Sequence, residues 1–459
     1  MANHQIGIPK GTRDFGPENM IKRNFIFDQI KVVFQKFGFL PLETPTMENL
    51  SVLTGKYGDE GDQLLFKVLN SGDFLSKVRQ EDLQQPQARE LLPQIAEKGL
   101  RYDLTVPFAR YVVMNRNDIN LPFKRYQIQP VWRADRPQRG RYREFYQCDA
   151  DVVGTDSLIC ESEIILMISE VFGRLGLKNY TIKMNNRKIL TGITEAIGAE
   201  GKEADFCVAI DKLDKIGKEA VQKELSSRGF TDRALELLEP FFNLPGGLTE
   251  KLHGLKTIFT HSATGTAGLE EISRIYQLAE ALQARLEHID FDITLARGLS
   301  YYTGTIFEVK VNDVQMGSVA GGGRYDNLTG VFGMPGLSGV GISFGVDRLY
   351  DVMDELKLFP ENQIESTQLM VANIDLASEP FALTTLTTIR NAGINSEIYP
   401  SSTKLKKQLN YADKKGIPYV LLIGPEEINT GKLSLRNMKT GEQAALTVEE
   451  IVKKITVAA

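Results

Sequence analysis

Five arginines crowd the fifteen residues 131–145, VWRADRPQRGRYREF, of a chain whose formal net charge is −5. A guanidinium stays charged at any cellular pH and presents a planar fork of donors that suits phosphate or carboxylate. Because like charges repel, a folded protein keeps such a cluster chiefly where an anion neutralises it. Asp135 and Glu144 lower the net positive charge of this segment, so a solvated loop of mixed charge is the alternative interpretation.

The segments on both sides of the cluster, KRYQIQPVW and YREFYQCDADVV, alternate as strands do, and RPQRGR has the composition of a turn. We therefore expect the arginines on and beside a β-hairpin. Arg141 and Arg143 would share one face of a strand, where they could converge on a single polyphosphate.

Two arginines far along the chain stand in similar strand-rich sequence, Arg297 in LARGLSYYTGTIFEV and Arg348 in SFGVDRL. Asp103 and Asp151 lie in neighbouring strand-like stretches. Guanidinium groups can bind a polyphosphate, and nearby carboxylates can bind the amine of a second substrate beside it. The glycine run GGGRYD has neither Walker nor Rossmann spacing, so tight packing or a turn is its preferred interpretation.

The composition narrows the class of protein. A chain of 459 residues, 42% hydrophobic and 25% charged, predicts two or three globular domains. No apolar stretch is long enough for a membrane span, and the N-terminal residues do not resemble a signal peptide, so we expect a cytoplasmic protein without a membrane partner. The cysteines and histidines show neither metal-ligand spacing nor a nucleophile elbow, which argues against a metal site and a Ser-His-Asp triad. These residues are Cys148, Cys160, Cys207, His4, His253, His261 and His288.

Hydrophobic periodicity places the elements that position these residues. It predicts helices over 21–37, from Pro107 to about 114 and from an N-cap at Thr155 or Asp156 to Gly176. Residues 70–98 have the composition of a polar surface excursion, and 187–283 that of a helical insertion. A polar linker over 356–367 precedes an α/β domain whose last helix opens with a capping box, Thr447 to Glu450. We expect the domains 1–186 (core, first part), 187–285 (helical insertion), 286–358 (core, second part) and 367–459.

The last domain carries a basic helix within STKLKKQLNYADKKG. A solvated helix face and a nucleic-acid contact are equally consistent with that pattern. The acidic total, with a pI near 5.7, argues against a general nucleic-acid coat but allows a local basic face.

Together, RADRPQRGRYREF, LARGLSYYTG, GGGRYD and GVGISFGVDRL, in this order and spacing, resemble the histidyl-tRNA synthetase family of class II aminoacyl-tRNA synthetases. The resemblance covers nearly the whole chain, from GIPKGTRDFGPE to KLKKQLNYADKKGIPYVLLIGPEE. It implies an α+β fold in which an antiparallel sheet is flanked by helices, with a helical insertion and a C-terminal anticodon-binding domain. It also implies that ATP, with Mg²⁺, activates L-histidine for transfer to the 3′ end of tRNA(His), and that the enzyme is a homodimer.

The resemblance also implies roles for individual residues. Arg133 and Arg297 would be catalytic, acting at the α-phosphate. ATP would be bound by Arg133, Asp135, Arg141, Phe145 and Arg348. Histidine would be bound by Asp103, Thr105, Gln147, Asp151, Arg297, Tyr301, Tyr302 and Tyr325, with Asp151 and Tyr302 at the two imidazole nitrogens. The tRNA would meet Arg136, Arg139, Lys404 and Lys407.

One departure from the family pattern is Ser300, where the family has aspartate in LARGLDYY. The excursion 70–98 is also longer than in compact bacterial members.

Two other classes of protein compete with the synthetase interpretation: a non-catalytic paralogue of the ATP phosphoribosyltransferase regulatory subunit type, and a tRNA-binding scaffold. The first has degraded motifs and no anticodon domain, and the second needs no histidine pocket.

The Arg297 assignment predicts that Arg297→Ala abolishes histidine-dependent ATP–pyrophosphate exchange while the thermal unfolding temperature stays near that of wild type. A fixed cation stabilises charge that develops on the α-phosphoryl oxygens without reorganisation. Near-wild-type exchange in this variant would refute the assignment.

Overall fold

The alternating segments beside the arginine cluster form two ten-residue strands, β5 (Phe123–Trp132) and β6 (Glu144–Val153), paired antiparallel as predicted. They belong to a computed structural model that describes residues 6–84, 87–242, 244, 246–296, 301–360 and 367–458. The turn between them closes with mutual backbone hydrogen bonds between Gln138 and Arg141. Gly140, at φ +70°, supplies the left-handed conformation that this turn requires.

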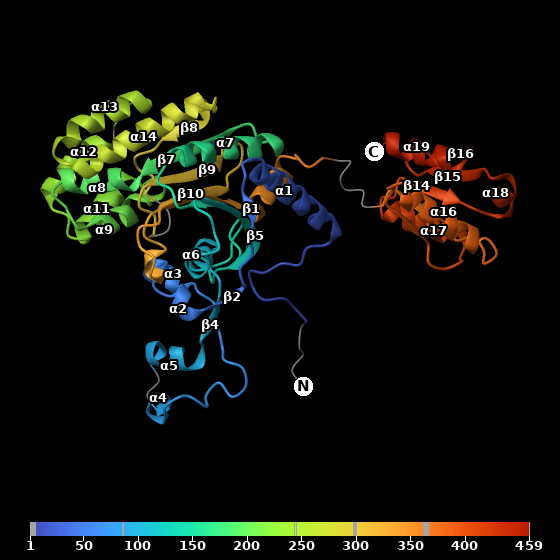
Figure 1. Cartoon of the computed structure of the whole chain (residues 1–459), viewed down its shortest axis with the longest axis horizontal. Coiled ribbons are helices and arrows are strands. Elements are labelled where there is room, and N and C mark those ends of the chain that lie inside the picture. The colour runs from blue at the N-terminus through green and yellow to red at the C-terminus, as the bar shows by residue number, and fades with distance from the viewer. Residues whose placement is uncertain are drawn as a thin grey trace. The chain divides into compact units, whose positions relative to one another are not determined.

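The two strands lie within an eight-stranded sheet of order β1-β5-β6-β11-β10-β9-β7-β8 (Figure 1). All its pairs are antiparallel except β1 with β5 and β7 with β8. The remaining strands are β1 (Leu40–Pro41), β7 (Tyr180–Asn186), β8 (Ile289–Phe291), β9 (Thr305–Val311), β10 (Ala320–Tyr325) and β11 (Gly339–Gly345).

Two helices, α1 (Pro17–Lys36) and α7 (Ile159–Arg174), cover one face of this sheet. Phe34 of α1 and Phe172 of α7 both contact Phe344 of β11, with ring centroids 6.0 and 6.4 Å apart. Because side chains alternate along a strand, the neighbours of Phe344 point to the opposite face. That second face carries the polar residues of β6.

The chain between β7 and β8 is helical, as its charged sequence, interrupted by loops, predicts. Its helices lie close together in Figure 1. They are α8 (Arg187–Ala196), α9 (Glu203–Ile210), α10 (Leu213–Ile216), α11 (Lys218–Ser227), α12 (Asp232–Phe242), α13 (Leu248–Ile258) and α14 (Ala263–Ala281), with short 3₁₀ turns at Phe259–His261 and Leu286–His288. The predicted domain limits at 186, 285 and 358 stay predictions.

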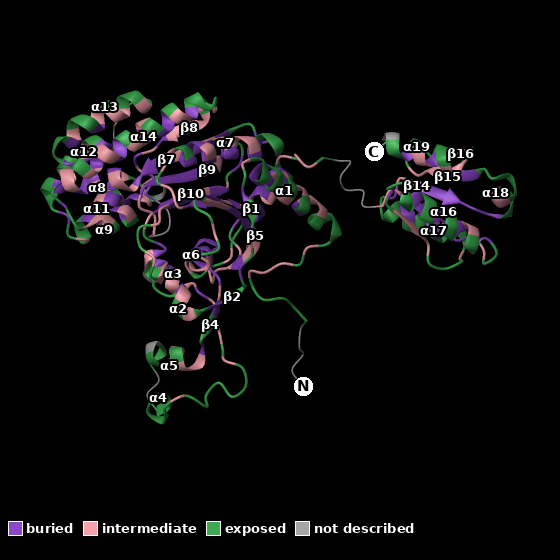
Figure 2. Ribbon diagram, in the orientation of Figure 1, coloured by how far each residue is buried: buried purple, intermediate pink, exposed green. Residues whose placement is uncertain are grey.

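A smaller sheet of order β2-β4-β3 carries the polar excursion. The excursion holds two short helices, and Figure 2 shows it mostly exposed. The elements of this region are β2 (Met47–Asn49), α2 (Leu50–Leu53), α3 (Gly58–Gln63), β3 (Lys67–Val68), α4 (Gln80–Gln84), α5 (Ala88–Ile95), β4 (Lys98–Leu100) and α6 (Thr105–Met114).

The chain divides into two compact units, Met1–Phe15 with Arg23–Leu358 and Gly16–Lys22 with Phe359–Ala459. The second contains a five-stranded sheet of order β13-β12-β14-β15-β16, whose core includes Leu369, Leu421 and Ile451. Its capping box is confirmed: the backbone N–H of Thr447 donates to Glu450, and that of Glu450 to Thr447 Oγ1. Its elements are β12 (Leu369–Val371), α16 (Glu379–Asn391), β13 (Ser396–Ile398), α17 (Leu405–Lys414), β14 (Tyr419–Leu422), α18 (Pro425–Thr430), β15 (Leu433–Asn437), β16 (Gln443–Leu446) and α19 (Val448–Ala458).

Two local predictions were wrong. The helix α7 begins at Ile159 after Leu158, not at a Thr155 or Asp156 cap, because the carbonyls of Thr155 and Ser157 accept hydrogen bonds from the Arg324 guanidinium. Arg141 and Arg143 lie in the connection between β5 and β6, not on a strand face. Within the described residues, no helix has the length and apolar character of a membrane span.

Candidate active site

Alternation along β6 puts Gln147, Asp149 and Asp151 on the sheet face opposite α1 and α7. The two aspartates line a small cavity on this face. Its other lining residues are Thr105, Tyr302, Gly321, Gly322, Gly323, Tyr325, Gly341, Ile342 and Ser343. Polar side chains at the centre of a large sheet, where apolar packing is expected, are typical of a binding site.

Glycines of β10 and β11 make the space for this cavity. Gly341 pairs with Asp151 across the strands, and a Cβ there would collide with Asp151 Oδ1. A Cβ on Gly321 would meet only Phe307 O, at 3.4 Å, so this glycine leaves open space beside the cavity. A Cβ on Gly322 would collide with Gly341 O, and one on Gly323 would lie 2.6 Å from Thr305 O, so these two glycines of GGGRYD serve close packing, the preferred interpretation of that motif.

Asp151 is held by two partners. Its Oδ2 pairs with Arg125 of β5 at 2.9 Å, and its Oδ1 accepts from the Tyr325 hydroxyl at 2.8 Å. All three side chains are buried. Desolvation by burial raises the pKa of Asp151, and the Arg125 guanidinium opposes that rise.

Asp149 is a site residue absent from the predicted set. It is 2% exposed, and burial raises its pKa to about 7, against the opposing charge of Arg125. Ser343 hydrogen-bonds Asp149 and accepts from Gln147 Nε2 at 2.7 Å. The period-two spacing of QCDAD was the sequence signal that could have found it, since it places Asp149 on the face of Gln147 and Asp151.

Asp103 precedes α6 and gathers donors from three segments. Its Oδ1 accepts from the Tyr57 hydroxyl and the Val106 N–H, both at 3.1 Å, and its Oδ2 accepts from the Tyr301 hydroxyl at 3.1 Å. The Tyr301 ring stands edge-on to that of Tyr302, 4.9 Å away. Desolvation by burial raises the pKa of Asp103.

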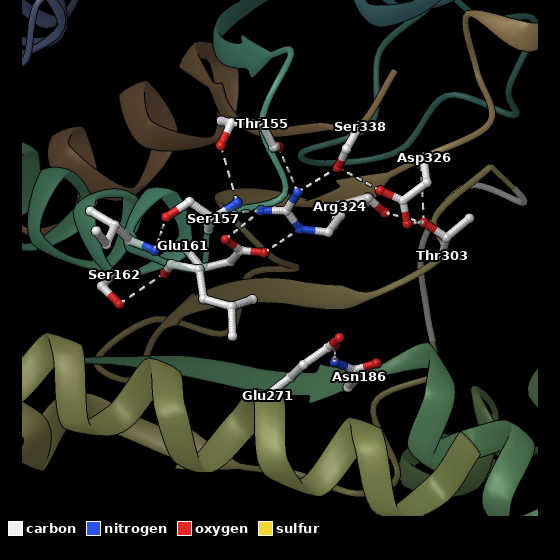
Figure 3. A network of polar contacts seen from close by, with 12 residues as sticks. Thr155, Ser157, Glu161, Ser162, Asn186, Glu271, Thr303, Arg324, Asp326 and Ser338 are labelled. Atoms are coloured by element: carbon white, nitrogen blue, oxygen red, sulfur yellow. Dashed lines mark hydrogen bonds and ion pairs between the residues drawn. The ribbon is translucent and has the colours of Figure 1, made fainter. Parts of the chain in front are cut away.

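A polar network on the opposite face positions the segment that carries the tyrosines (Figure 3). The Arg324 guanidinium donates to both carboxylate oxygens of Glu161, at 2.6 and 2.7 Å, and to Ser338 Oγ at 2.6 Å. The Ser338 hydroxyl donates to Asp326, which accepts from Thr303 Oγ1, each at 2.6 Å. Thr303 directly follows Tyr302, so the network ties this segment to the end of β10.

Arg133 lies between two aromatic rings at the start of the hairpin connection. Its guanidinium carbon is 4.2 Å from the ring centroid of Tyr102 and 5.2 Å from that of Phe145, and its Nε donates to Tyr102 O at 3.1 Å. Stacking restricts its orientation. Its charge acts on Asp103, whose pKa it lowers against the effect of burial.

The other predicted ATP residues lie on the same hairpin and on α15 (Val346–Glu355). Arg141 pairs with Asp135 at 3.5 Å. Arg348 donates to Gly140 O and to Ser318 O, both at 2.6 Å, which holds the hairpin turn against α15. Arg143 donates to the backbone carbonyls of Asp135 and Lys10.

The predicted tRNA residues are all exposed side chains, Arg136, Arg139, Lys404 and Lys407. Arg139 pairs with Glu355. Arg297 and Ser300 lie outside the described residues. Sequence reasoning also missed Asp347, which accepts from Arg13, from Arg23 at 2.7 Å and from the Tyr146 N–H at 2.9 Å, joining the N-terminal segment, α1 and β6.

Comparison with known proteins agrees with this arrangement. The family model described as "Histidyl-tRNA synthetase" matches residues 73–349, and that described as "Anticodon binding domain" matches 368–457. The histidine–tRNA ligase of Cytophaga hutchinsonii is 60% identical over 448 residues, covering 98% of this chain and 99% of that protein. That of Phocaeicola vulgatus is 57% identical, covering 97% and 98%. The crystal structure of a histidyl-tRNA synthetase from a Nostoc species superposes with a TM-score of 0.82 at 29% identity, over 99% of this chain and all of that one.

The structure has a mainly antiparallel sheet flanked by helices, an arginine-rich connection between β5 and β6, and Arg348 in the first turn of the helix that follows β11. This combination is the catalytic fold of class II aminoacyl-tRNA synthetases. The chain belongs to the histidyl-tRNA synthetase family. The predicted fold and ligase activity are thereby confirmed. The regulatory-paralogue alternative is not favoured, because relatives matching nearly the whole chain are histidine–tRNA ligases.

The cavity predicts opposite outcomes for two glycine substitutions. Gly321→Ala adds a methyl group on the face of Ser343, its cross-strand partner, so we expect a raised KM for histidine and an unfolding temperature close to wild type. Gly341→Ala forces Asp151 to move and lowers the unfolding temperature by several degrees. Pyrophosphate-exchange kinetics and thermal melts measure both, and an unchanged KM in Gly321→Ala would show that the cavity does not hold the amino acid.

Proposed function

We propose that this enzyme activates L-histidine in the β6 cavity and transfers it to tRNA(His) in two steps. A histidine carboxylate oxygen attacks the α-phosphorus of ATP, the bond to the bridging oxygen breaks, and pyrophosphate leaves. A hydroxyl at the 3′ end of the tRNA then attacks the carbonyl carbon, and AMP leaves. Two observations carry the proposal. The carboxylates of Asp103, Asp149 and Asp151 are buried. The Arg133 guanidinium stacks on the rings of Tyr102 and Phe145.

In the amino-acid site, Asp103, Thr105 and Gln147 surround the α-amino group. Asp103 is ringed by hydroxyl and amide donors that fix its carboxylate, and Gln147 Oε1 is a buried acceptor. Both suit an ammonium ion, which offers three donors and no acceptor. Asp151 and Tyr302 bind the imidazole side, with Tyr301 and Tyr325 as the neighbouring walls.

In the ATP site, Arg133 holds the α-phosphate and Phe145 stacks on adenine. Arg348 covers the other side of the base, while Asp135 and Arg141 line the phosphates. Arg297 adds a second catalytic cation, which contacts the α-phosphate and the substrate carboxylate. The rigid stacking of Arg133 supports its role, since a preorganised cation stabilises developing negative charge most effectively.

Magnesium accompanies ATP in this proposal. Mg²⁺ takes oxygen ligands, usually one or two carboxylates together with phosphate oxygens and water. We assign no residue of this chain to the ion, because the half-buried Asp135 at the hairpin is paired with Arg141. When bound, the ion neutralises phosphate charge.

Outside the catalytic centre, Arg136 and Arg139 contact the acceptor end of tRNA, and Lys404 and Lys407 contact its anticodon region. The exposed positions of all four support this assignment. We further propose a homodimer formed through the segment around Pro45, and action in the cytoplasm. A sedimentation-equilibrium mass of 51.3 kDa, that of one chain, would exclude the dimer.

A pair of hairpin variants separates the two half-reactions. Arg133→Ala should lower kcat of histidine-dependent pyrophosphate exchange by about 10²–10³-fold, the usual cost of removing one oxyanion donor. Arg136→Ala, at the exposed tip, should leave exchange unchanged and raise KM for tRNA in aminoacylation. Equal loss of exchange in both variants would contradict the assignment, and no exchange with folded wild-type enzyme would contradict the proposed function.

A further inference from the structure

The N-terminal segment, residues 9–15, lies against the connection between β5 and β6, beside the proposed ATP site. The backbone N–H of Arg143 donates to Gly11 O at 2.8 Å. Gly11 has φ +89°, and a Cβ there would collide with side-chain atoms of Arg143 and Pro137, at 2.8 Å. The N-terminal segment and the hairpin connection are therefore in close contact, although they are far apart in the sequence.

Arg13 of this segment contacts two elements that carry proposed ATP residues. Its guanidinium donates to Asp347 Oδ1, in the first turn of α15. The same guanidinium lies over the ring of Tyr142, with its carbon 3.3 Å from the ring centroid. The Tyr142 hydroxyl in turn donates to Asp351 of α15 at 2.9 Å. Arg13 therefore joins the hairpin connection to the start of α15.

Asp347 takes the place of a strand partner at the start of β6. The pairing of β11 with β6 ends opposite Gln147, and the chain then turns into α15. The N–H of Tyr146 donates to Asp347 Oδ2 at 2.9 Å, so a carboxylate oxygen accepts where a strand carbonyl would. Phe145 directly precedes Tyr146, and Arg348 directly follows Asp347. One carboxylate thus fixes the backbone next to both residues that we assign to the adenine.

Two guanidinium groups share the Asp347 carboxylate. Arg23 of α1 donates to Oδ1 at 2.7 Å and is 1% exposed, whereas the Arg13 side chain is 26% exposed. If Arg13 is removed, the carboxylate keeps Arg23 and the Tyr146 N–H as partners. Loss of Arg13 therefore leaves no unpaired charge in the interior, unlike the loss of a sole ion-pair partner. What Arg13 adds is the link to Tyr142 and the hairpin connection.

Resting on the proposed function, we infer that Arg13 is a positioning residue for ATP, which acts through Asp347 and Tyr142. It holds the hairpin connection and the start of α15 in the arrangement that binds the nucleotide. A site held in its binding arrangement beforehand loses less conformational entropy when the substrate binds, so loss of Arg13 weakens ATP binding. The histidine site does not need this link, because Gln147 and Asp151 are paired with both β5 and β11.

Pyrophosphate exchange measures KM for ATP and KM for histidine separately. In Arg13→Ala, KM for ATP should rise about tenfold, while KM for histidine should change less than about twofold. Arg13→Lys keeps a cation beside Asp347 but loses the planar group over Tyr142, so it should recover part of the lost affinity for ATP. Arg233→Ala removes an exposed arginine of the helical insertion and is the matched control, which should change neither KM.

A double-mutant cycle tests whether Arg13 acts through the hairpin connection. Tyr142→Leu removes the ring beneath the guanidinium and should also raise KM for ATP. Because both substitutions break one link, Arg13→Ala should add less than about twofold to KM for ATP in the Tyr142→Leu background. Effects that multiply in full would overturn the inference.

Thermal unfolding separates this role from a structural one. Because Arg23 still pairs with Asp347, Arg13→Ala should unfold within about 3 °C of wild type. Partial loss of the fold lowers the apparent kcat but leaves KM unchanged, so the two KM values decide the inference. An unchanged KM for ATP, or equal increases in both KM values, would overturn it. Wild-type enzyme without histidine-dependent exchange would instead overturn the proposed function on which it rests.

Discussion

The structure depends on keeping three carboxylates, those of Asp103, Asp149 and Asp151, buried beside the central strands of a sheet. Taking a carboxylate out of water costs several kcal/mol unless charges or hydrogen bonds compensate it. The compensation comes from different elements: Arg125 from β5, Tyr325 from β10, and Tyr57 with Tyr301 from segments outside the sheet. The compensation is incomplete at Asp149, whose Oδ1 has no hydrogen-bond partner among the described residues.

The same requirement explains the glycines. Carboxylates can lie on the inner face of a sheet only if the neighbouring strands leave room, and Gly341 has no side chain at the point where it approaches the Asp151 carboxylate. The opposite face of the same strands has ordinary apolar packing, with Cys148, Ala150 and Phe344 buried against the helices. One sheet therefore combines a conventional core with a polar binding surface, through the two-residue alternation of its strands.

Buried ion pairs join segments that are distant in sequence. Asp347 connects Arg13, Arg23 and the start of β6, and Arg324 connects β10 with Glu161 of α7. Replacing such a pair by apolar residues could be neutral for stability, but removing one partner leaves an uncompensated charge. These pairs thus set the relative positions of the motifs whose residues form the two proposed substrate sites.

Much of this protein was determined by its sequence alone. The hairpin followed from alternation and turn chemistry, the helical insertion from periodicity, the C-terminal capping box from its four-residue spacing, and the family from motif order. Those features are local, or they are recorded directly as residue types at fixed spacings. The tertiary structure decided what depends on partners far along the chain. It decided that α7 starts at Ile159 because Arg324 takes the preceding carbonyls, that Arg143 donates to the backbone of Asp135 and Lys10, and that Asp149 faces the cavity with one oxygen that has no partner among the described residues. Neither the desolvation of a carboxylate nor the partner that compensates it can be read from the residues beside it, because both depend on which strands the sheet brings together.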